Sequence, residues 1–281
     1  MFVLRKNPAI LESAEKAAEQ IQYAKQRLAD GSCGLVFEPG EHRYFLGGKE
    51  LRSVSSIVSH FAPVDTLALA RRASVNPNHQ YFGRSPEEIM ELWALKRDNA
   101  AAAGTRVHAF AEACCDFLLG KEEEMEPRFR EMLTEDGLVA TEPKDVAVAR
   151  WWADIDWNRY AFVAKETRIA NPVLRYAGTF DTLLYDRYLL GYAQKDYKTN
   201  EDLNKWYGDK LLPPLNNIKA NDIGKYTVQQ TLYTITLRQL GLNVVSNDLV
   251  WLKENEYEEK GLELRYDRIV AYAVDKLNNQ S

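Results

Sequence analysis

Two short segments carry side chains whose types and spacing suit catalysis. The segment GTFD ends at Asp181, and the segment DYK begins at Asp196 and ends at Lys198. Side chains two positions apart in a β-strand point to the same face, so Asp196 and Lys198 share a face. If the chain turns back near Tyr188-Leu189, Asp181 comes opposite Asp196. This arrangement predicts that two carboxylates and an ammonium group converge.

Such a cluster predicts a site for a hard metal ion. Two adjacent carboxylates repel each other unless a cation lies between them, and oxygen ligands suit Mg²⁺ or Mn²⁺. The ion would polarise a phosphoryl oxygen and activate a water, while Lys198 would orient that water or stabilise the transition state. The matching reaction is phosphodiester hydrolysis. An isolated D-x-K segment is more often a solvated strand face, so the interpretation depends on the residues that accompany it.

Two further groups accompany this cluster. His108 lies in a helical stretch upstream, with Glu112 one turn further along the same face, and its imidazole suits a metal ligand or a contact to the scissile phosphate. Gln229 and Tyr233 are four residues apart on a predicted downstream helix, so both reach one side. Each group alone is more typical of a partly buried helix face.

The four segments GTRVH, GTFD, DYK and QQTLY, in this order, resemble the motifs G-x-x-x-H, G-x-x-D, D-x-K and Q-x-x-x-Y. These are the motifs of PD-(D/E)XK nucleases of the RecB-like branch. The resemblance covers residues 104–233. Within the branch, ETRIANPVLRYAGTFDTLLYD and the Lys-Thr that ends the D-x-K strand are especially similar to the mitochondrial genome maintenance exonuclease and related phage exonucleases.

The resemblance implies one or two Mg²⁺ or Mn²⁺ ions. The ligands that it implies are Asp181, Asp196, the backbone carbonyl of Tyr197 and His108, with Glu112 or Glu166 as weaker candidates.

The resemblance also implies that Lys198 is catalytic, that His108 takes part in catalysis, and that Gln229 and Tyr233 position the substrate strand or the lysine. Iron–sulfur members of the branch need three cysteines after Q-x-x-x-Y, whereas no cysteine follows Cys115. We therefore predict no iron–sulfur cluster.

DNA binding must come from a local patch because the net charge is −5. Lysines and aromatic residues alternate between Lys195 and Lys225, as in channels for single-stranded DNA. A solvated loop explains this composition equally well. Predicted substrate contacts are Thr199, Lys205, Trp206 and Lys225, and the stretch also includes Lys195, Tyr207 and Tyr226.

The periodicity predicts helices at 8–29, from Ser53 and from Ser85, with a small hairpin at 35–51. Ser85 and Glu88 form a predicted capping box. Gly104 is expected to mark either a break in the long helix that follows or a close backbone approach. Three successive strands follow from about 160. Beyond them we expect a helix at about 222–240, strands at 243–254 and 261–269, and a final helix at 270–279.

These elements, with the resemblance, predict an α/β (mixed α+β) fold of the restriction-endonuclease type, in which helices flank a central mixed β-sheet. We expect a single nuclease domain over 1–281, with a mainly helical N-terminal elaboration at 1–95 and a nuclease core at 96–281. No apolar run is long enough to span a bilayer, and the acidic N-terminus suits no secretory signal, so we expect no membrane association and a cytoplasmic location.

The predicted function is metal-dependent DNA exonuclease activity on single-stranded or end-containing DNA, in replication, repair or recombination, with a recombination or replication protein as a further partner. Two alternatives stay open. The first is a structure-specific or restriction-type endonuclease with the same metal site. The second is an inactive DNA-binding or recombination accessory module, which the presence of Asp181, Asp196 and Lys198 disfavours.

Overall fold

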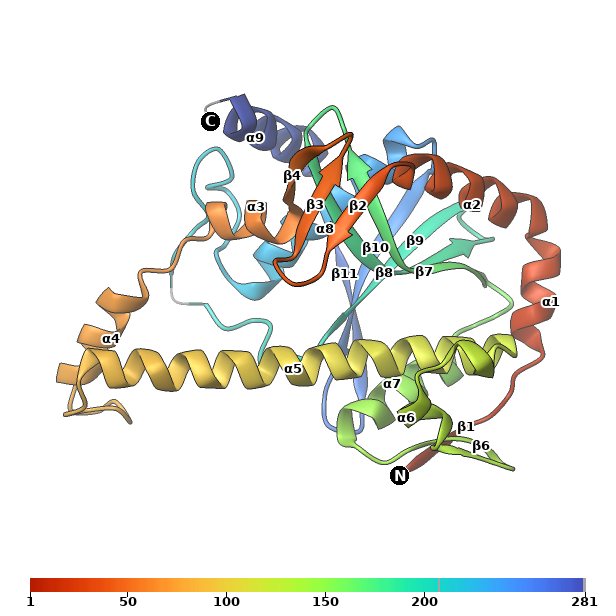
Figure 1. The fold of residues 1–281 in the computed structure, drawn as a ribbon, viewed down its shortest axis with the longest axis horizontal. Coiled ribbons are helices and arrows are strands. Elements are labelled where there is room, and N and C mark those ends of the chain that lie inside the picture. Colours follow the sequence, from red (N-terminus) through yellow and green to blue (C-terminus); the bar gives the residue numbers. More distant parts are fainter. Residues whose placement is uncertain (207, 280–281) are drawn as a thin grey trace. The chain divides into compact units, whose positions relative to one another are not determined.

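The three strands expected after residue 160 pair with one another in sequence order within one mixed sheet. In the computed structural model, which describes residues 1–206 and 208–279, β7 (Tyr160–Asn171) pairs antiparallel with β8 (Tyr176–Asp186). Strand β9 (Gly191–Lys198) pairs antiparallel with β8, and β10 (Val244–Leu252) lies parallel to β9. Strand β11 (Tyr257–Leu262) extends this mixed sheet, and helices flank it (Figure 1). The predicted mixed α/β fold is therefore confirmed.

One edge of β8 changes partner along its length. Strand β7 pairs with β8 from Tyr176 to Asp186 and so occupies the opposite edge. The edge that changes partner pairs with β4 (Lys49–Ser53) at Tyr176–Ala177 and with β9 at Thr182–Asp186. The segment Gly178–Asp181 therefore lies between these two pairings.

Strand β4 belongs to the predicted hairpin, which is confirmed as a three-stranded meander. Strands β2 (Leu35–Glu38), β3 (Arg43–Leu46) and β4 pair antiparallel in sequence order. Helix α3 (Val54–Phe61) follows β4 directly, and the Ser53 hydroxyl accepts a hydrogen bond from the Ser56 N–H at 3.1 Å, as the predicted N-cap.

Two helices cover opposite faces of the sheet. Gln194 of β9 donates a hydrogen bond at 2.9 Å to Thr234 of α8 (Asp222–Gln239). The ring of Tyr197 lies 5.3 Å from that of Trp151 on α7 (Pro143–Asp154). Because alternate side chains of a strand point to opposite faces, α8 covers the face that carries Asp196, and α7 covers the other.

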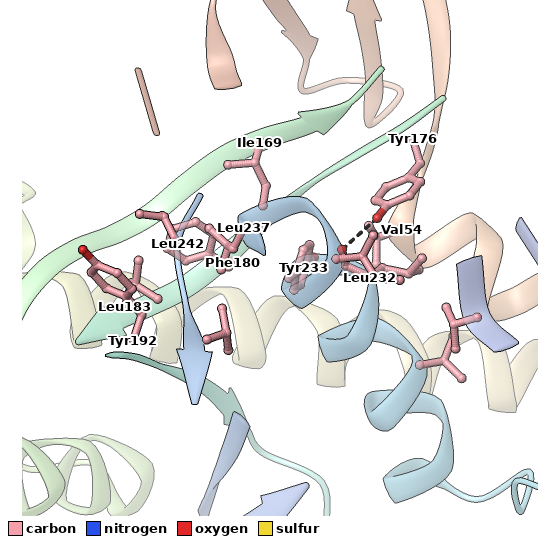
Figure 2. Packing of buried hydrophobic residues seen from close by; sticks show 14 of the residues in the cluster. Val54, Ile169, Tyr176, Phe180, Leu183, Tyr192, Leu232, Tyr233, Leu237 and Leu242 are labelled. Atoms are coloured by element: carbon pink, nitrogen blue, oxygen red, sulfur yellow. Dashed lines mark hydrogen bonds between the residues drawn. The ribbon is translucent and has the colours of Figure 1, made fainter. Parts of the chain in front are cut away.

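The largest hydrophobic core lies between this sheet and the helices beside it. Figure 2 shows Leu232 and Tyr233 of α8 near Val54 of α3 and Tyr176 of β8. The Tyr176 hydroxyl donates a hydrogen bond of 2.8 Å to the carbonyl oxygen of Leu232. This packing fixes α8 and α3 beside the Gly178–Asp181 segment.

Two helix predictions are wrong in detail. The helix expected at 8–29 is two helices, α1 (Ala9–Lys16) and α2 (Ala18–Ser32), because the backbone leaves the helical region at buried Ala17. Both helices contact β7. Gly104 does not break α5 (Pro86–Leu119), since a single glycine costs only ~1 kcal/mol in a helix interior.

The strand expected at 261–269 is also misplaced. A tight turn follows β10 directly, in which the Lys253 N–H donates to the Glu256 carbonyl at 2.8 Å and Asn255 has a φ of 61°. Strand β11 therefore begins at Tyr257, and α9 (Asp267–Asn279) follows it. The remaining elements include the small antiparallel sheet of β1 (Phe2–Leu4), β6 (Gly137–Ala140) and β5 (Leu133–Thr134), the 3₁₀ helix Glu122–Glu124, and α6 (Pro127–Arg130).

The chain divides into two compact units, and the prediction of one nuclease domain stays a prediction. The larger unit comprises 1–62 and 110–281, and the smaller comprises Pro63–Ala109. The smaller unit contains α4 (Thr66–Val75) and the first part of α5, around buried Ala70, Ala73 and Ile89. The predicted capping box is confirmed there: Ser85 and Glu88 each donate a backbone N–H to the side chain of the other, at 2.9 and 3.2 Å. None of the helices described here is long and apolar enough to cross a membrane.

Asp186 fixes the turn between β8 and β9 that brings Asp181 and Asp196 together. Its Oδ1 accepts the N–H groups of Tyr188 and Leu189 at 2.9 and 3.0 Å. Its Oδ2 accepts two hydrogen bonds from Arg159, at 2.6 and 2.9 Å. Burial of the carboxyl opposes ionisation, but the Arg159 and backbone donors outweigh it and hold the Asp186 pKa below its ordinary value.

We predict that Asp186→Asn lowers the free energy of unfolding by about 2 kcal/mol at neutral pH, because the charge-assisted hydrogen bonds from Arg159 weaken. Since the folded-state pKa is lowered, this contribution is present above the unfolded-state pKa and disappears as the pH falls through the folded-state value. Denaturant unfolding at several pH values measures it. Asp156→Asn is the control, because Asp156 is exposed and its carboxylate accepts the backbone N–H of Asn158 at 2.9 Å. An equal loss in both variants would contradict the prediction.

Candidate metal centre

Asp181 and Asp196 occupy opposite positions on β8 and β9. The antiparallel register pairs Thr182 with Lys195, so the next step of the same register places Asp181 opposite Asp196. Asp181 Oδ2 accepts the N–H of Tyr197 at 2.7 Å, which holds the carboxylate against the backbone of β9. Both side chains belong to largely buried residues, 8% and 1% exposed respectively. The convergence expected from the sequence is present.

Glu166 extends this pair into a row across three strands. Strands β7 and β8 pair Lys165 with Thr182 and Thr167 with Phe180, which places Glu166 opposite Asp181. Glu166 has a φ of 39°, in the left-handed region that only a few per cent of non-glycine residues adopt. The row Glu166, Asp181 and Asp196 thus puts three carboxylates at adjoining positions of β7, β8 and β9.

Glu166 and Asp181 lie close enough to share a metal ion, because a carboxylate oxygen of one lies within 4.8 Å of a carboxylate oxygen of the other. His108, the predicted further ligand, lies on the part of α5 that belongs to the smaller unit. Helix α5, which carries His108, continues without a break into Phe110–Leu119 of the larger unit. Carboxylate oxygens and an imidazole nitrogen suit Mn²⁺, and the carboxylates alone suit Mg²⁺, so the donor set fits either ion.

Lys198 lies beside the acidic row and contacts Asp196. Its ammonium group forms an ion pair with the Asp196 carboxylate and lies 4.4 Å from the centre of the Tyr226 ring. Burial favours the neutral amine, but the negative charges of Asp196 and Asp181 outweigh it and raise the pKa of Lys198 above its ordinary value. Lys198 therefore carries a positive charge next to the carboxylates at neutral pH.

Glu112, the other weaker candidate, lies near the same charges. Its carboxylate is 3.8 Å from the Lys165 ammonium group, which also contacts Asp116 at 2.5 Å. Burial and the negative charge of Glu166 raise the pKa of Glu112 to about 7.

Gln229 and Tyr233 are brought together on α8, as the sequence predicts. Burial raises the pKa of the Tyr233 hydroxyl, and the negative charges of Asp196 and Asp181 act in the same direction. Both side chains line one groove, where Tyr233 lies against Gly178 of β8. Gly178 makes room for this contact: a Cβ there would lie 2.8 Å from Cε1 of Tyr233 and 2.9 Å from Cγ2 of Val54. The glycine of the GTFD segment thus allows α8 and α3 to approach β8 closely.

Some of the predicted DNA-contacting residues lie near the candidate metal centre, and others lie on a connecting segment. Lys225 lines a groove together with Gln229 and Tyr233. Thr199, Lys205 and Trp206 lie on the connection between β9 and α8, where the Trp206 ring contacts Lys219 at 4.7 Å. Tyr207 lies outside the described residues.

Lys195 was a wrong expectation for DNA contact. The strand pleat turns it to the face opposite Asp196, where it is 3% exposed and pairs with Asp248 at 3.1 Å and Glu259 at 2.9 Å.

Two neighbours of the candidate metal centre were not assigned from the sequence. The first is Tyr44, whose hydroxyl is 3.2 Å from that of Thr179, and the second is the Ser53–Ser59 segment that lines the groove. The cluster of serines in SVSSIVSH was the available signal for the second.

No family model matches this chain, and none of the curated proteins matches it. Among solved structures, the chain is similar to a crystal structure of a protein from Eubacterium rectale named "Putative exonuclease", with a TM-score of 0.40 and 16% sequence identity. The match covers 64% of this chain, which spans 65% of the length of that neighbour. Because the TM-score is below 0.5, the function proposed below rests on this chain's own residues.

We predict that Gly178→Ala lowers the free energy of unfolding by about 1–3 kcal/mol, because the added methyl group displaces Tyr233 and Val54 from β8. Thermal or denaturant unfolding measures the loss. Gly40→Ala is the matched control, since a Cβ at Gly40 meets no atom within 4 Å and should leave stability unchanged. Equal stability of Gly178→Ala and the wild type would show that the close approach of α8 to β8 is not required.

Proposed function

We propose that the chain is a metal-dependent nuclease that hydrolyses DNA phosphodiester bonds, and that it belongs to the RecB-like branch of the PD-(D/E)XK nucleases. The observation that carries this proposal is the row of Glu166, Asp181 and Asp196 on three adjacent strands, beside the buried ammonium group of Lys198. The order of the four sequence motifs supports the same conclusion.

Three neighbouring carboxylates and one ammonium group leave an excess of negative charge in a largely buried place. Like charges at this spacing destabilise one another, and a bound divalent cation relieves the repulsion. We propose Asp181, Asp196 and the Tyr197 carbonyl as ligands, with Glu166 beside them and with His108 as the further ligand that the motif resemblance implies. A bound Mg²⁺ or Mn²⁺ ion supplies Lewis acidity toward a phosphoryl oxygen and a lower pKa of a bound water.

The residues of the chain supply positioning and charge. Lys198, held charged by the adjacent carboxylates, is placed to stabilise the additional negative charge on the phosphoryl group in the transition state. Its contact with the Tyr226 ring restricts where the ammonium group can lie. Gln229, which lines the groove together with Tyr233 and Gly178, is placed to orient the substrate strand.

We further propose exonuclease action on single-stranded or end-containing DNA. The groove that Gln229 and Tyr233 line has a volume of about 360 Å³. Cavities of this size hold ligands of small-molecule dimensions, which matches one unpaired nucleotide and not a stacked duplex.

We predict that Asp196→Asn and Lys198→Gln each lower the rate of DNA cleavage at least about a hundredfold, because each removes a charge from the proposed centre. End-labelled linear single strands, linear duplexes and circular single strands, digested with Mg²⁺, Mn²⁺ or EDTA, measure activity and end dependence together. Linear strands should be shortened from their ends and circles should stay intact.

Asp202→Asn is the matched control, because Asp202 is an exposed carboxylate on the connection between β9 and α8 and accepts the N–H of Asn204 at 2.8 Å. It should cleave at the wild-type rate. Cleavage by Asp196→Asn within a few-fold of the wild type would refute the proposed site, whereas efficient cutting of circles would refute exonuclease action alone.

A further inference from the structure

Two hollows on the larger unit meet beside the candidate metal centre. The inner hollow is the groove already described, of about 360 Å³, which Gly178, Thr179 and Gln229 help to line. The outer hollow, of about 520 Å³, is lined by Arg52 and Arg175 among others. Because His42 and Ser53 line both hollows, these are neighbouring parts of one groove, which we call the β3–α3 groove. The groove begins three residues before Asp181 and leads away across β3, β4 and α3.

The inner part has the chemistry that a nucleotide requires. Three serines, Ser53, Ser55 and Ser59, contribute hydroxyl groups, and Lys225, which also pairs with Asp222 at 3.2 Å, contributes an ammonium group. Hydroxyl and ammonium groups are common partners of phosphate and sugar oxygens. Gln229 reaches the same space from the side of the metal centre.

His42 supplies an exposed ring where the two parts meet. Its imidazole packs edge-on against Phe37 at 5.2 Å and Tyr44 at 5.7 Å, which fixes the orientation of the ring. The residue has a φ of 52°, in the left-handed region, so the turn between β2 and β3 holds it in an unusual conformation. Exposed, fixed aromatic rings are surfaces on which unpaired bases stack.

The outer part contains arginine side chains that can meet phosphates. Arg175 donates to the carbonyl oxygen of Asn278 and to the side-chain oxygen of Asn279 at 3.1 Å, and both acceptors are neutral. Arg52 donates to the side-chain oxygen of Asn278 at 2.8 Å. Arg43, by contrast, contacts three carboxylates, and two of them, Glu41 and Glu50, line the outer hollow, so this cluster carries net negative charge. Arg175, whose hydrogen-bond acceptors are neutral, is the cation placed to meet a phosphate, and Arg52 lines the same hollow.

We propose that the β3–α3 groove binds the unpaired substrate strand next to the scissile bond, with a base against His42 and the following phosphates at Arg52 and Arg175. The proposal rests on the proposed nuclease function and deepens it, because it assigns the substrate path to Arg175 and to residues 41–59, a part of the chain that no nuclease motif covers. Thr179 and Gly178 connect the groove to Asp181 along β8.

Ser59→Trp tests the inner part, because Ser59 is exposed on α3 and a tryptophan there fills the groove without entering the core. The affinity for a short fluorescein-labelled oligo(dT) is measured by anisotropy with Mg²⁺, in full-length chains that carry Asp196→Asn to prevent cutting. We expect affinity to fall about tenfold, the equivalent of one lost stacking contact. Ser32→Trp, at a partly exposed serine at the end of α2, is the matched control and should bind as before.

Arg175→Gln tests the outer part. Removing one phosphate contact to a single strand should reduce the slope of log affinity against log salt concentration by about 0.7. Arg27→Gln is the control, since Arg27 also donates to a backbone carbonyl, that of Leu240 at 2.5 Å, but lies on α2. Thermal unfolding of each variant identifies any loss of binding that comes from misfolding.

The outcomes separate this proposal from the nuclease function. Unchanged affinity in Ser59→Trp and an unchanged salt slope in Arg175→Gln, with metal-dependent cleavage by the wild type, would overturn the groove and leave the function intact. If Ser59→Trp weakened the affinity for a DNA duplex as much as the affinity for oligo(dT), the assignment of the groove to an unpaired strand would be overturned. Absence of cleavage by the wild type would instead overturn the proposed function.

Discussion

The divided edge of β8 is the constraint on which the rest of the site depends. Strand β7 occupies one edge throughout, while β4 and β9 share the other. Between their pairings, Gly178–Asp181 faces side chains of α3, α8 and β9 instead of a continuous neighbouring strand. The Asp181 carboxylate accordingly accepts the N–H of Tyr197. Backbone donors in a buried place must be paired, so the acid that the proposed chemistry uses also satisfies the backbone.

The pleat of the sheet places lysines and carboxylates that are adjacent in the sequence on opposite faces. Lys165 precedes Glu166 on β7, and Lys195 precedes Asp196 on β9. Each lysine points to the face covered by α7 and the end of α5, where it pairs with acids of other elements, Asp116 for Lys165 and Asp248 with Glu259 for Lys195. The acids Glu166 and Asp196 are left in the row with Asp181. This separation concentrates negative charge at the centre, and Lys198 offsets only part of it.

The sequence predicted the parts of the site that depend on local pattern. Alternation along β9 and a turn near Tyr188 were sufficient to place Asp181 opposite Asp196, because antiparallel register follows from turn position. Spacing along α8 predicted the joint position of Gln229 and Tyr233. The unbroken α5 was missed because Gly104 is a weak helix breaker when the residues around it favour helix.

Features that depend on distant pairing could not be predicted in this way. Strand β4 meets β8 more than a hundred positions later in the chain, and no local pattern encodes that pairing. The β3–α3 groove and the partners of Lys195 are consequences of it and of similar long-range contacts. Lys195 shows the difficulty clearly: its spacing fits a basic DNA-binding stretch, yet the strand pleat buries it between two acids.

The central claim is that the row of carboxylates binds a divalent cation. Anomalous diffraction from crystals grown with Mn²⁺ locates such an ion directly, independently of any activity. We expect an anomalous peak in contact with the carboxylates of Asp181 and Asp196, and its loss in crystals of Asp181→Asn. Mn²⁺-dependent cleavage by a chain whose crystals show the ion elsewhere, or show none at this position, would contradict the account.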